Sequence, residues 1–355
     1  MRRDWIFAVL LGCTGGAVGC HKDGSADSAH APKASPKKAQ TRLSLQQLIP
    51  APGVVVLLHL RPAQLMANAE LRHDWEAVLQ TDRLVAFQHA TGFDPNRMQE
   101  LWWAGYALGS LLLVDAQEDG ARIEQAFIAS ASSDLEHQKD ESGGRLISAV
   151  VGGEPQALYH RSGDFIAIAY GDIGLVKIVR GYALNRLRAK TALDTRFLAP
   201  LKDLDAQAPL RVFLAGPFEH AQGDIAQGFA AGVLSVTPND SHLQVSAHAR
   251  GLWPEDTAPA LEQWWRKVLN SSESRAVGLG FPTASPVVSC HQEPGSSDMA
   301  FTQCDTQLVY SSGTLAQAVH QLTEGSSASL LEDPASGWRK QLLAPPTAPS
   351  TADSP

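Results

Sequence analysis

A succession of short β-prone segments between residues 101 and 170 constrains the fold of this chain more than any other feature of its sequence. Apolar and β-branched residues are grouped into runs, which glycine-rich or acidic turn residues such as those at 117–120 separate. Successive strands with short turns imply an antiparallel sheet, because a parallel pair needs a long crossover connection. The predicted strands span residues 101–107, 111–114, 121–130, 146–151, 157–160 and 165–170.

Segments on both sides of this region add helices and further strands. Residues 54–60 form a continuous apolar run after a Pro-Gly pair, which predicts a buried strand. Residues 174–182 predict a helix, because Leu175, Ile178 and Val179 recur at helical spacing. Further helices are predicted at 62–68, 73–79, 82–89 and 258–269, and a further strand at 242–250. The sequence therefore predicts an α+β fold, a predominantly antiparallel sheet with flanking helices.

The second half of the chain partly repeats the first. Residues 208–214 resemble residues 51–57, and residues 308–315 resemble residues 168–175. These matches suggest two related α+β units, one at 43–200 and one at 205–332. Coincidence remains an open alternative, because Ala-Pro before a strand is common. Different strand orders in the two halves would rule the repeat out.

Composition separates the globular part of the chain from its two ends. The chain is 44% hydrophobic and 19% charged, values typical of a folded protein. Residues 20–42 lack apolar periodicity and predict a flexible tether, which reaches about 25 Å as a random chain and about 65 Å as polyproline II. The segment 344–355 is rich in Pro, Ala, Ser and Thr, which predicts a disordered tail.

The net charge argues against one class of partner. The formal charge is −8, and a protein that binds nucleic acid neutralises phosphates with clustered Lys and Arg. Nucleic acid is therefore not an expected partner. Lys33, Lys37, Lys38 and Arg42 form a small basic group, which either attracts anionic lipid headgroups or belongs to a solvated linker.

The first nineteen residues have the order of a secretory signal. Arg2 and Arg3 precede an apolar run at 5–11, and small residues follow at 15–17. The apolar run is shorter than the roughly 20 residues that span a bilayer. The arginine pair also resembles a twin-arginine signal, although an ordinary positive region is the preferred interpretation. We expect residues 1–19 to be a removable signal peptide.

The residues that follow resemble a known processing site. Ala17-Val18-Gly19-Cys20 is similar to the lipobox of bacterial lipoproteins, although Ala17 stands where Leu is usual. The resemblance implies that Cys20 is acylated and becomes the new N-terminus. Leu10-Leu11-Gly12-Cys13 matches the lipobox better, but cleavage there would leave a signal too short for ordinary export, so Cys20 is preferred. Two or more acyl chains would anchor the chain stably at a membrane without spanning it.

The remaining cysteines form a single pair. In an oxidising compartment, Cys290 and Cys304 are expected to form a disulfide across a hairpin centred near Ser297. Closing a loop of this size contributes about 3 kcal/mol in the chain-entropy model. A metal site with His291 as third ligand is the alternative, but the pair lacks the Cys-x-x-Cys spacing of structural zinc sites.

Candidate catalytic side chains lack a recognisable motif. The chain has 12 histidines, but none belongs to a metalloprotease helix, and no nucleophile elbow or phosphate-binding loop is present. His160 with Ser162 and Asp164 supplies the residue types of a hydrolase, yet these residues also suit a tight turn. His242 and His248 share a strand face but are too far apart to hold one metal. No catalytic, cofactor-binding or metal-binding residue is assigned.

Two tryptophan pairs suggest either core packing or a partner surface. Trp102 and Trp103 lie on a predicted strand, where adjacent side chains face opposite sides, so one of them should be partly exposed unless both faces are covered. Trp264 and Trp265 lie on the predicted helix 258–269, where Leu261, Trp265 and Val268 form an apolar stripe. Exposed aromatic residues can mark a contact surface.

Together these features predict a membrane-tethered envelope lipoprotein that acts as a non-enzymatic binding or structural module. Its folded part would lie in the periplasm or at the cell surface, with another envelope protein as a possible partner. Two alternatives remain open. One is a periplasmic hydrolase whose site combines distant residues such as His160, Asp164 and His291. The other is a carrier of apolar ligands that uses the curved sheet as a trough.

Overall fold

A computed structural model gives the arrangement of most of the folded part. It describes residues 43–68, 88, 91–94, 96–115, 120–132, 135–161, 164–188, 191–216, 224–239, 242–271, 282–293 and 301–311. The predicted signal peptide, the acylation site Cys20, the tether and the tail at 344–355 lie outside these residues. The predicted helix at 73–79 and most of the one at 82–89 lie outside them too.

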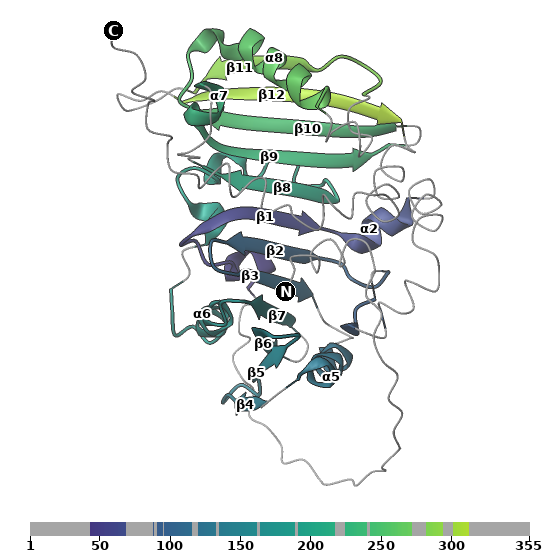
Figure 1. The fold of residues 1–355 in the computed structure, drawn as a ribbon, viewed down its shortest axis with the longest axis vertical. Coiled ribbons are helices and arrows are strands. Elements are labelled where there is room, and N and C mark those ends of the chain that lie inside the picture. The colour runs from purple at the N-terminus through teal and green to yellow at the C-terminus, as the bar shows by residue number, and fades with distance from the viewer. Residues whose placement is uncertain are drawn as a thin grey trace, which may run out of the picture.

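The described strands form one antiparallel sheet (Figure 1), in the order β11-β12-β10-β9-β8-β1-β2-β3-β7-β6-β5-β4. Every pair of neighbouring strands is antiparallel, as the short turns predicted. The strands are β1 (Val54–Leu60), β2 (Leu101–Tyr106), β3 (Ser110–Asp115), β4 (Glu136–Lys139), β5 (Arg145–Val151), β6 (Glu154–Arg161), β7 (Phe165–Tyr170), β8 (Leu210–Ala215), β9 (Phe229–Pro238), β10 (His242–Gly251), β11 (Val287–Gln292) and β12 (Thr302–Ser311).

The strand order runs outward from the centre in both directions. β1 pairs with β8, and from this pair β1-β2-β3 and β8-β9-β10 each form a three-stranded meander. In each half the chain then passes through a helix, α5 (Gly120–Ser130) or α8 (Ala258–Leu269), before a further strand. The chain returns inward so that β7 pairs with β3 and β12 pairs with β10. The first half has two additional strands, β4 and β5, at its outer edge.

The sheet has two distinct faces. We call face A the one that carries Leu57, Trp102 and Phe213, and face B the one that carries their neighbours Leu58 and Trp103. Each face has its own core, because successive side chains of a strand point to opposite sides. A sheet buried on both faces explains why several strands are continuous apolar runs rather than alternating ones.

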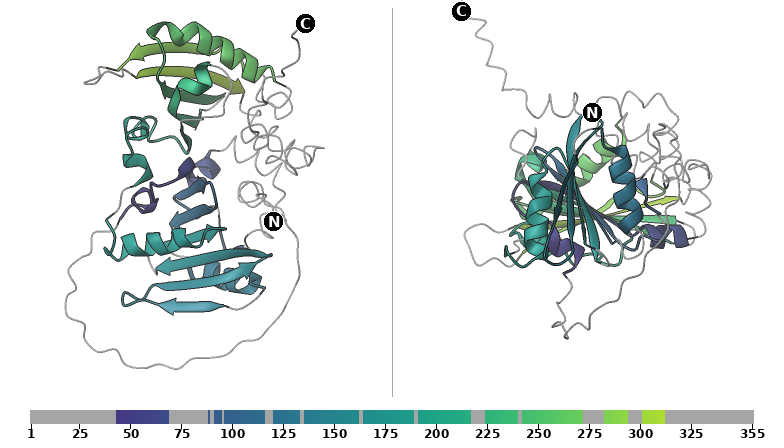
Figure 2. Two further views of the ribbon diagram at one scale, coloured as in Figure 1. Left: turned by 60° about the vertical axis from the view of Figure 1, so that its left-hand side comes forward. Right: turned by 90° about the horizontal axis from the view of Figure 1, so that it is seen from below.

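The helices cover different parts of these faces. Helix α6 (Gly174–Ala183) packs on face A of the first half through Leu175, Val176 and Val179. Helix α5 packs on face B of the same half, and α8 packs on face B near β11. Figure 2 shows α5 and α6 on opposite sides of the twisted sheet. The short elements are α2 (Pro62–Ala67), α7 (Asp224–Gly228), η1 (Leu45–Leu48), η2 (Ala192–Asp194), η3 (Ala199–Leu201) and η4 (Glu255–Thr257).

One predicted strand is wrong. Residues 121–130 form helix α5, not a strand. Its buried residues Gly120, Ile123, Glu124 and Phe127 are three or four positions apart, which is the helical period rather than the strand period of two. The segment is short and mainly apolar, so the helical stripe is easily mistaken for a buried strand.

The mixed α+β composition and the dominance of antiparallel sheet are confirmed. Strands β1 and β7 and helix α8 have the predicted bounds. Gly92 has φ +74°, the left-handed conformation expected for a residue that ends a helix. The sequence reasoning missed β4, which is entirely polar, and it named no strand at β9.

Candidate functional site

The predicted disulfide lies at one edge of the sheet. Cys290 on β11 and Cys304 on β12 are directly opposite each other, with a Cα–Cα distance of 4.1 Å and an S–S bond. Cys304 is fully buried and packs in a small cluster with Trp253 and Leu261. The two sulfur atoms bond each other, as expected for a disulfide rather than for a metal site with His291 as third ligand.

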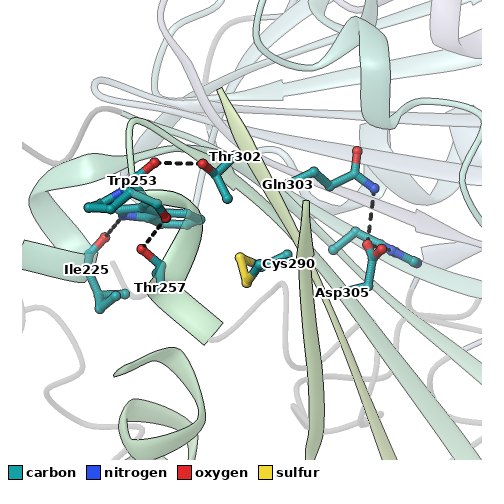
Figure 3. Close-up of a disulfide and its surroundings, with 10 residues drawn as sticks. Ile225, Trp253, Thr257, Cys290, Thr302, Gln303 and Asp305 are labelled. Atoms are coloured by element: carbon teal, nitrogen blue, oxygen red, sulfur yellow. Dashed lines mark hydrogen bonds and ion pairs between the residues drawn. A yellow bond between two sulfur atoms is a disulfide. The ribbon is translucent and has the colours of Figure 1, made fainter. Parts of the chain in front are cut away.

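Hydrogen bonds fix the loop that packs against the disulfide (Figure 3). The Trp253 indole donates to the carbonyl of Ile225 at 3.0 Å, and the Thr302 hydroxyl donates to the carbonyl of Trp253 at 2.6 Å. The Thr257 hydroxyl donates to the carbonyl of Pro254 at 2.7 Å. These bonds satisfy polar groups inside an otherwise apolar cluster, as buried donors and acceptors require.

Three polar side chains, which we call the relay, lie together at the centre of face A: His59, Glu100 and Arg211. His59 on β1 is 1% exposed, and its Nδ1 accepts hydrogen bonds from Nε and Nη2 of Arg211 on β8, at 3.3 and 3.1 Å. Its Nε2 lies 3.3 Å from a carboxylate oxygen of Glu100. Arg211 also donates to the carbonyl of Lys202 at 2.9 Å, and the indole of Trp102 donates to Glu100 at 2.8 Å. The relay thus connects β2, β1, β8 and the segment that precedes β8.

The surroundings of His59 favour the neutral form of its imidazole. Burial lowers the pKa of His59, and the nearby Arg211 guanidinium lowers it further. Burial opposes ionisation of Glu100, but hydrogen bonds from His59 and Trp102 hold the pKa of this carboxyl below its ordinary value. The imidazole stacks on Trp102, with ring centroids 4.3 Å apart. The relay has the carboxylate and imidazole of a general base, but both imidazole nitrogens already face protein groups.

A second histidine on face A bridges two carboxylates. Nδ1 of His248 on β10 lies 2.6 Å from Asp305 on β12, and Nε2 lies 3.0 Å from Asp205 in the segment before β8. The hydrogen bond to Asp305 raises the pKa of His248, against the opposing effect of burial. Burial disfavours the charged Asp305, but the bond to His248 holds the pKa of Asp305 below its ordinary value. His248 therefore links the connecting segment to the sheet through its two carboxylate contacts.

The residues of the hydrolase alternative are not brought together. His160 on β6 faces Glu124 on α5, with Nδ1 and a carboxylate oxygen 3.0 Å apart, and Arg145 lies 2.9 Å from the same oxygen. The carboxylate of Asp164 is paired with Arg161 at 2.9 Å. His291 is exposed on β11, with eight strands between β11 and β6 in the sheet. Ser162 lies outside the described residues.

The structure places an apolar strip at the centre of face B. We define the central strip as Val56, Trp103, Val212, Leu214 and Leu234, on strands β1, β2, β8 and β9. These side chains are partly exposed, and Leu214 reaches 39%. On face A of the same strands, Leu57, Trp102, Phe213 and Val233 are buried. At the sheet centre, these face A side chains are buried, whereas the five side chains of the central strip on face B are partly exposed around the buried Leu58.

The tryptophan pairs divide between burial and exposure. Trp102 is 1% exposed on face A, whereas Trp103 is half-buried on face B, so the two face opposite sides as predicted. The indole ring of Trp103 lies close over Gly105, where any larger side chain would collide with it. On α8, Trp265 packs against the core and Trp264 remains 39% exposed. Trp103 thus belongs to the surface of the central strip.

The sequence reasoning did not name the relay residues His59, Glu100 and Arg211. Only one signal was available, since His59 is a polar residue inside the continuous apolar run of β1. A buried polar residue requires a hydrogen-bonding partner, but the partner is 152 positions away.

Within the described ranges, no helix combines the length and the apolar character needed to cross a membrane.

Comparisons with known proteins provide no family for this chain. No family model matches it, and no curated protein matches it. Three crystal forms of TP0453, a Treponema protein, match this chain at 12% sequence identity. Crystal form IV matches with a TM-score of 0.44 over 78% of this chain and 96% of the other. Form I gives 0.43 over 80% and 99%, and form III gives 0.44 over 80% and 100%. Similarities of this size assign no function to the chain.

Proposed function

We propose that this chain is a lipid-anchored protein of the bacterial cell envelope whose folded part is a non-enzymatic binding or structural module. The observation that carries the proposal is the sequence Ala17-Val18-Gly19-Cys20 after a signal-like segment. Acylation of Cys20 would hold the protein at a membrane surface, and the tether at 20–42 would let the folded part stand clear of the headgroups.

The folded part supports this proposal in two ways. The Cys290–Cys304 disulfide is typical of proteins that fold in an oxidising compartment. The polar clusters of the described residues are structural, because the imidazoles of His59, His160 and His248 are each engaged by neighbouring side chains. A hydrolase would need a histidine beside a nucleophile in an accessible site.

The central strip is the surface that we assign to binding. A partly exposed apolar surface on a monomer marks a contact site when polar side chains surround it. Trp103 and Leu214 supply aromatic and aliphatic anchor groups of the kind that dominate binding energies. The same observation favours a second candidate function, a carrier in which an apolar ligand occupies this strip.

We also propose that the two halves are related units, with helices flanking the sheet in each. The strand orders of the halves support this, because β1-β2-β3 with β7 and β8-β9-β10 with β12 have the same arrangement. The segments 51–57 and 208–214, which are similar in sequence, lead into strands β1 and β8, and these two strands pair with each other. Superposing an experimental structure of one half on the other tests the relation.

The anchor is tested by substituting Cys20. Cys20→Ser is expected to abolish labelling by a fatty-acid probe and to release the protein from the membrane fraction. Cys13→Ser is the matched control and is expected to leave labelling intact. Label that persists in Cys20→Ser and disappears in Cys13→Ser would move the anchor to Cys13. An unprocessed, unlabelled chain in the cytosol would refute the proposal.

The binding surface is tested by site-specific photocrosslinking in intact envelopes. A crosslinker at Leu214 samples the central strip, and one at Leu108, an exposed turn residue, is the control. We expect one defined protein adduct at Leu214 that is absent at Leu108. Adducts of a small apolar molecule would favour the carrier function instead. Equal crosslinking at both positions would argue against a binding role for the strip.

A further inference from the structure

The two outer edges of the sheet differ in how they are protected. β4 ends the sheet on one side, and its exposed residues include the charged Glu136 and Lys139. β11 ends it on the other side with the sequence Val-Val-Ser-Cys-His-Gln, which carries no Asp, Glu, Lys or Arg. Charged side chains on edge strands prevent unwanted pairing, so β4 has this protection and β11 lacks it.

The hydrogen-bond register shows which backbone groups face outward at β11. Glu293 donates its backbone N–H to the carbonyl of Phe301, which continues the ladder between β11 and β12. In an antiparallel ladder, every second residue bonds to the partner strand, and the residues between point away from it. Val287, Ser289 and His291 therefore bond to β12. The N–H and C=O groups of Val288, Cys290 and Gln292 point outward, where no strand of the described residues pairs with β11.

The first half of the sheet has a strand at the equivalent position. β6 and β7 occupy the places in the first half that β11 and β12 occupy in the second, and β5 pairs with the outer side of β6. β11 has no such neighbour among the described strands. The disulfide to β12 holds β11 in the extended conformation that a further strand would need.

We infer that β11 pairs antiparallel with β11 of a second copy of this chain, joining two sheets through a two-fold axis. An antiparallel edge is self-complementary, because a two-fold axis perpendicular to the sheet superposes its donors on the acceptors of the other copy. Centring the axis on Cys290 places Val288 opposite Gln292 of the other copy. This register uses all three outward residues. A pairing of Val288 with Cys290 of the other copy would place Gln292 opposite Pro286, which has no N–H to donate.

The side chains at this interface are compatible with a second copy. Val287, Ser289 and His291 lie on face A, where all three are exposed, and Val287 is 69% exposed. In the inferred register Ser289 lies opposite His291 of the other copy, so no like charges meet. The inference rests on the edge geometry and does not require the proposed anchor, although anchoring would concentrate the copies.

The test measures the mass of the processed full chain and of two matched proline variants by analytical ultracentrifugation. Gln292→Pro removes an outward N–H at β11, and the side chain of Gln292 is exposed. His137→Pro removes an outward N–H at β4, because the bond from Asp140 to the carbonyl of Gly144 places Gln138 in the ladder and His137 outside it. We expect a dimer for the wild type and for His137→Pro, and at least a tenfold weaker dimer for Gln292→Pro.

A second variant covers the case in which proline disturbs the strand. Ser289→Lys retains every backbone group and introduces a charge beside His291 of the other copy, so it should also yield monomers with an unchanged circular dichroism spectrum. A wild-type chain that remains monomeric at about 1 mM overturns the inference. A dimer that both β11 variants retain also overturns it. Neither result depends on acylation of Cys20.

Discussion

One row of side chains crosses face A and changes from mostly apolar to polar at the centre of the sheet. On the first side the row contains Tyr159, Ala167, Leu113 and Trp102, all buried and mostly apolar. Beyond His59 it continues through Arg211, Ser235, Ser246 and Gln307. The two halves have similar strand orders, but along this row the first half carries mostly apolar side chains and the second half carries polar ones.

This difference shows that strand order does not determine how a sheet is stabilised. In the first half, α6 packs apolar residues onto face A. In the second half, the segment before β8 contributes buried leucines to the face A core and adds polar contacts, namely Asp205 to His248 and the carbonyl of Arg196 to Arg250. Loss of a side chain that makes polar contacts is expected to reduce the free energy of unfolding less than loss of a side chain in a packed core.

The largest effect is expected from truncation of the apolar part of the row. Leu113→Ala should reduce the free energy of unfolding by about 3–4 kcal/mol, because it leaves a cavity in a closely packed core. The matched variant in the other half is Ser246→Ala, which should cost less than about 1 kcal/mol. Denaturant unfolding of both variants measures the difference. Equal losses would contradict the contrast between the halves.

Removal of the disulfide should affect the second half. The double variant Cys290→Ser/Cys304→Ser is expected to lose about 3 kcal/mol of stability, since a loop of 14 residues is no longer closed. Hydrogen exchange should show faster opening of β11 and β12 while β5 and β6 remain protected. Uniformly faster exchange across the whole sheet would instead indicate that the halves unfold as one unit.

The histidine bridge predicts a pH dependence. Because the pKa of His248 is raised above 6.5, its bonds to Asp305 and Asp205 contribute fully below about pH 6.5 and are lost as the pH rises through the raised pKa. His248→Gln should remove about 1–2 kcal/mol of stability at low pH and less at high pH. His242→Gln on the same strand is the control. An unchanged pH profile in His248→Gln would show that the bridge is not protonated.

The smallest effect is expected at the exposed tryptophan of α8. Trp264→Ala should change the free energy of unfolding by about 0.5 kcal/mol or less, because much of this side chain is already in contact with water. Trp265→Ala should cost several times more, since Trp265 packs against the core. Thermal unfolding of the two variants compares them directly, and a larger loss at Trp264 would reverse their roles.

The sequence by itself determined the features that depend on neighbouring residues. The continuous apolar runs of β1 and β7 have the predicted bounds, and the turn residues between Cys290 and Cys304 predicted a hairpin that pairs them. Helix α5 was mistaken for a strand, because a short apolar run has nearly the same composition in both. The charged strand β4 was missed, because it has no apolar pattern.

Only the tertiary structure decided which distant residues meet. His59 and Arg211 face each other because β1 and β8 pair in one register, and no local pattern encodes a register across 152 positions. The same pairing places the partly exposed central strip on face B and the buried side chains of the same strands on face A. The physical reason is that local periodicity determines which way a side chain points, whereas the arrangement of remote segments determines what covers it.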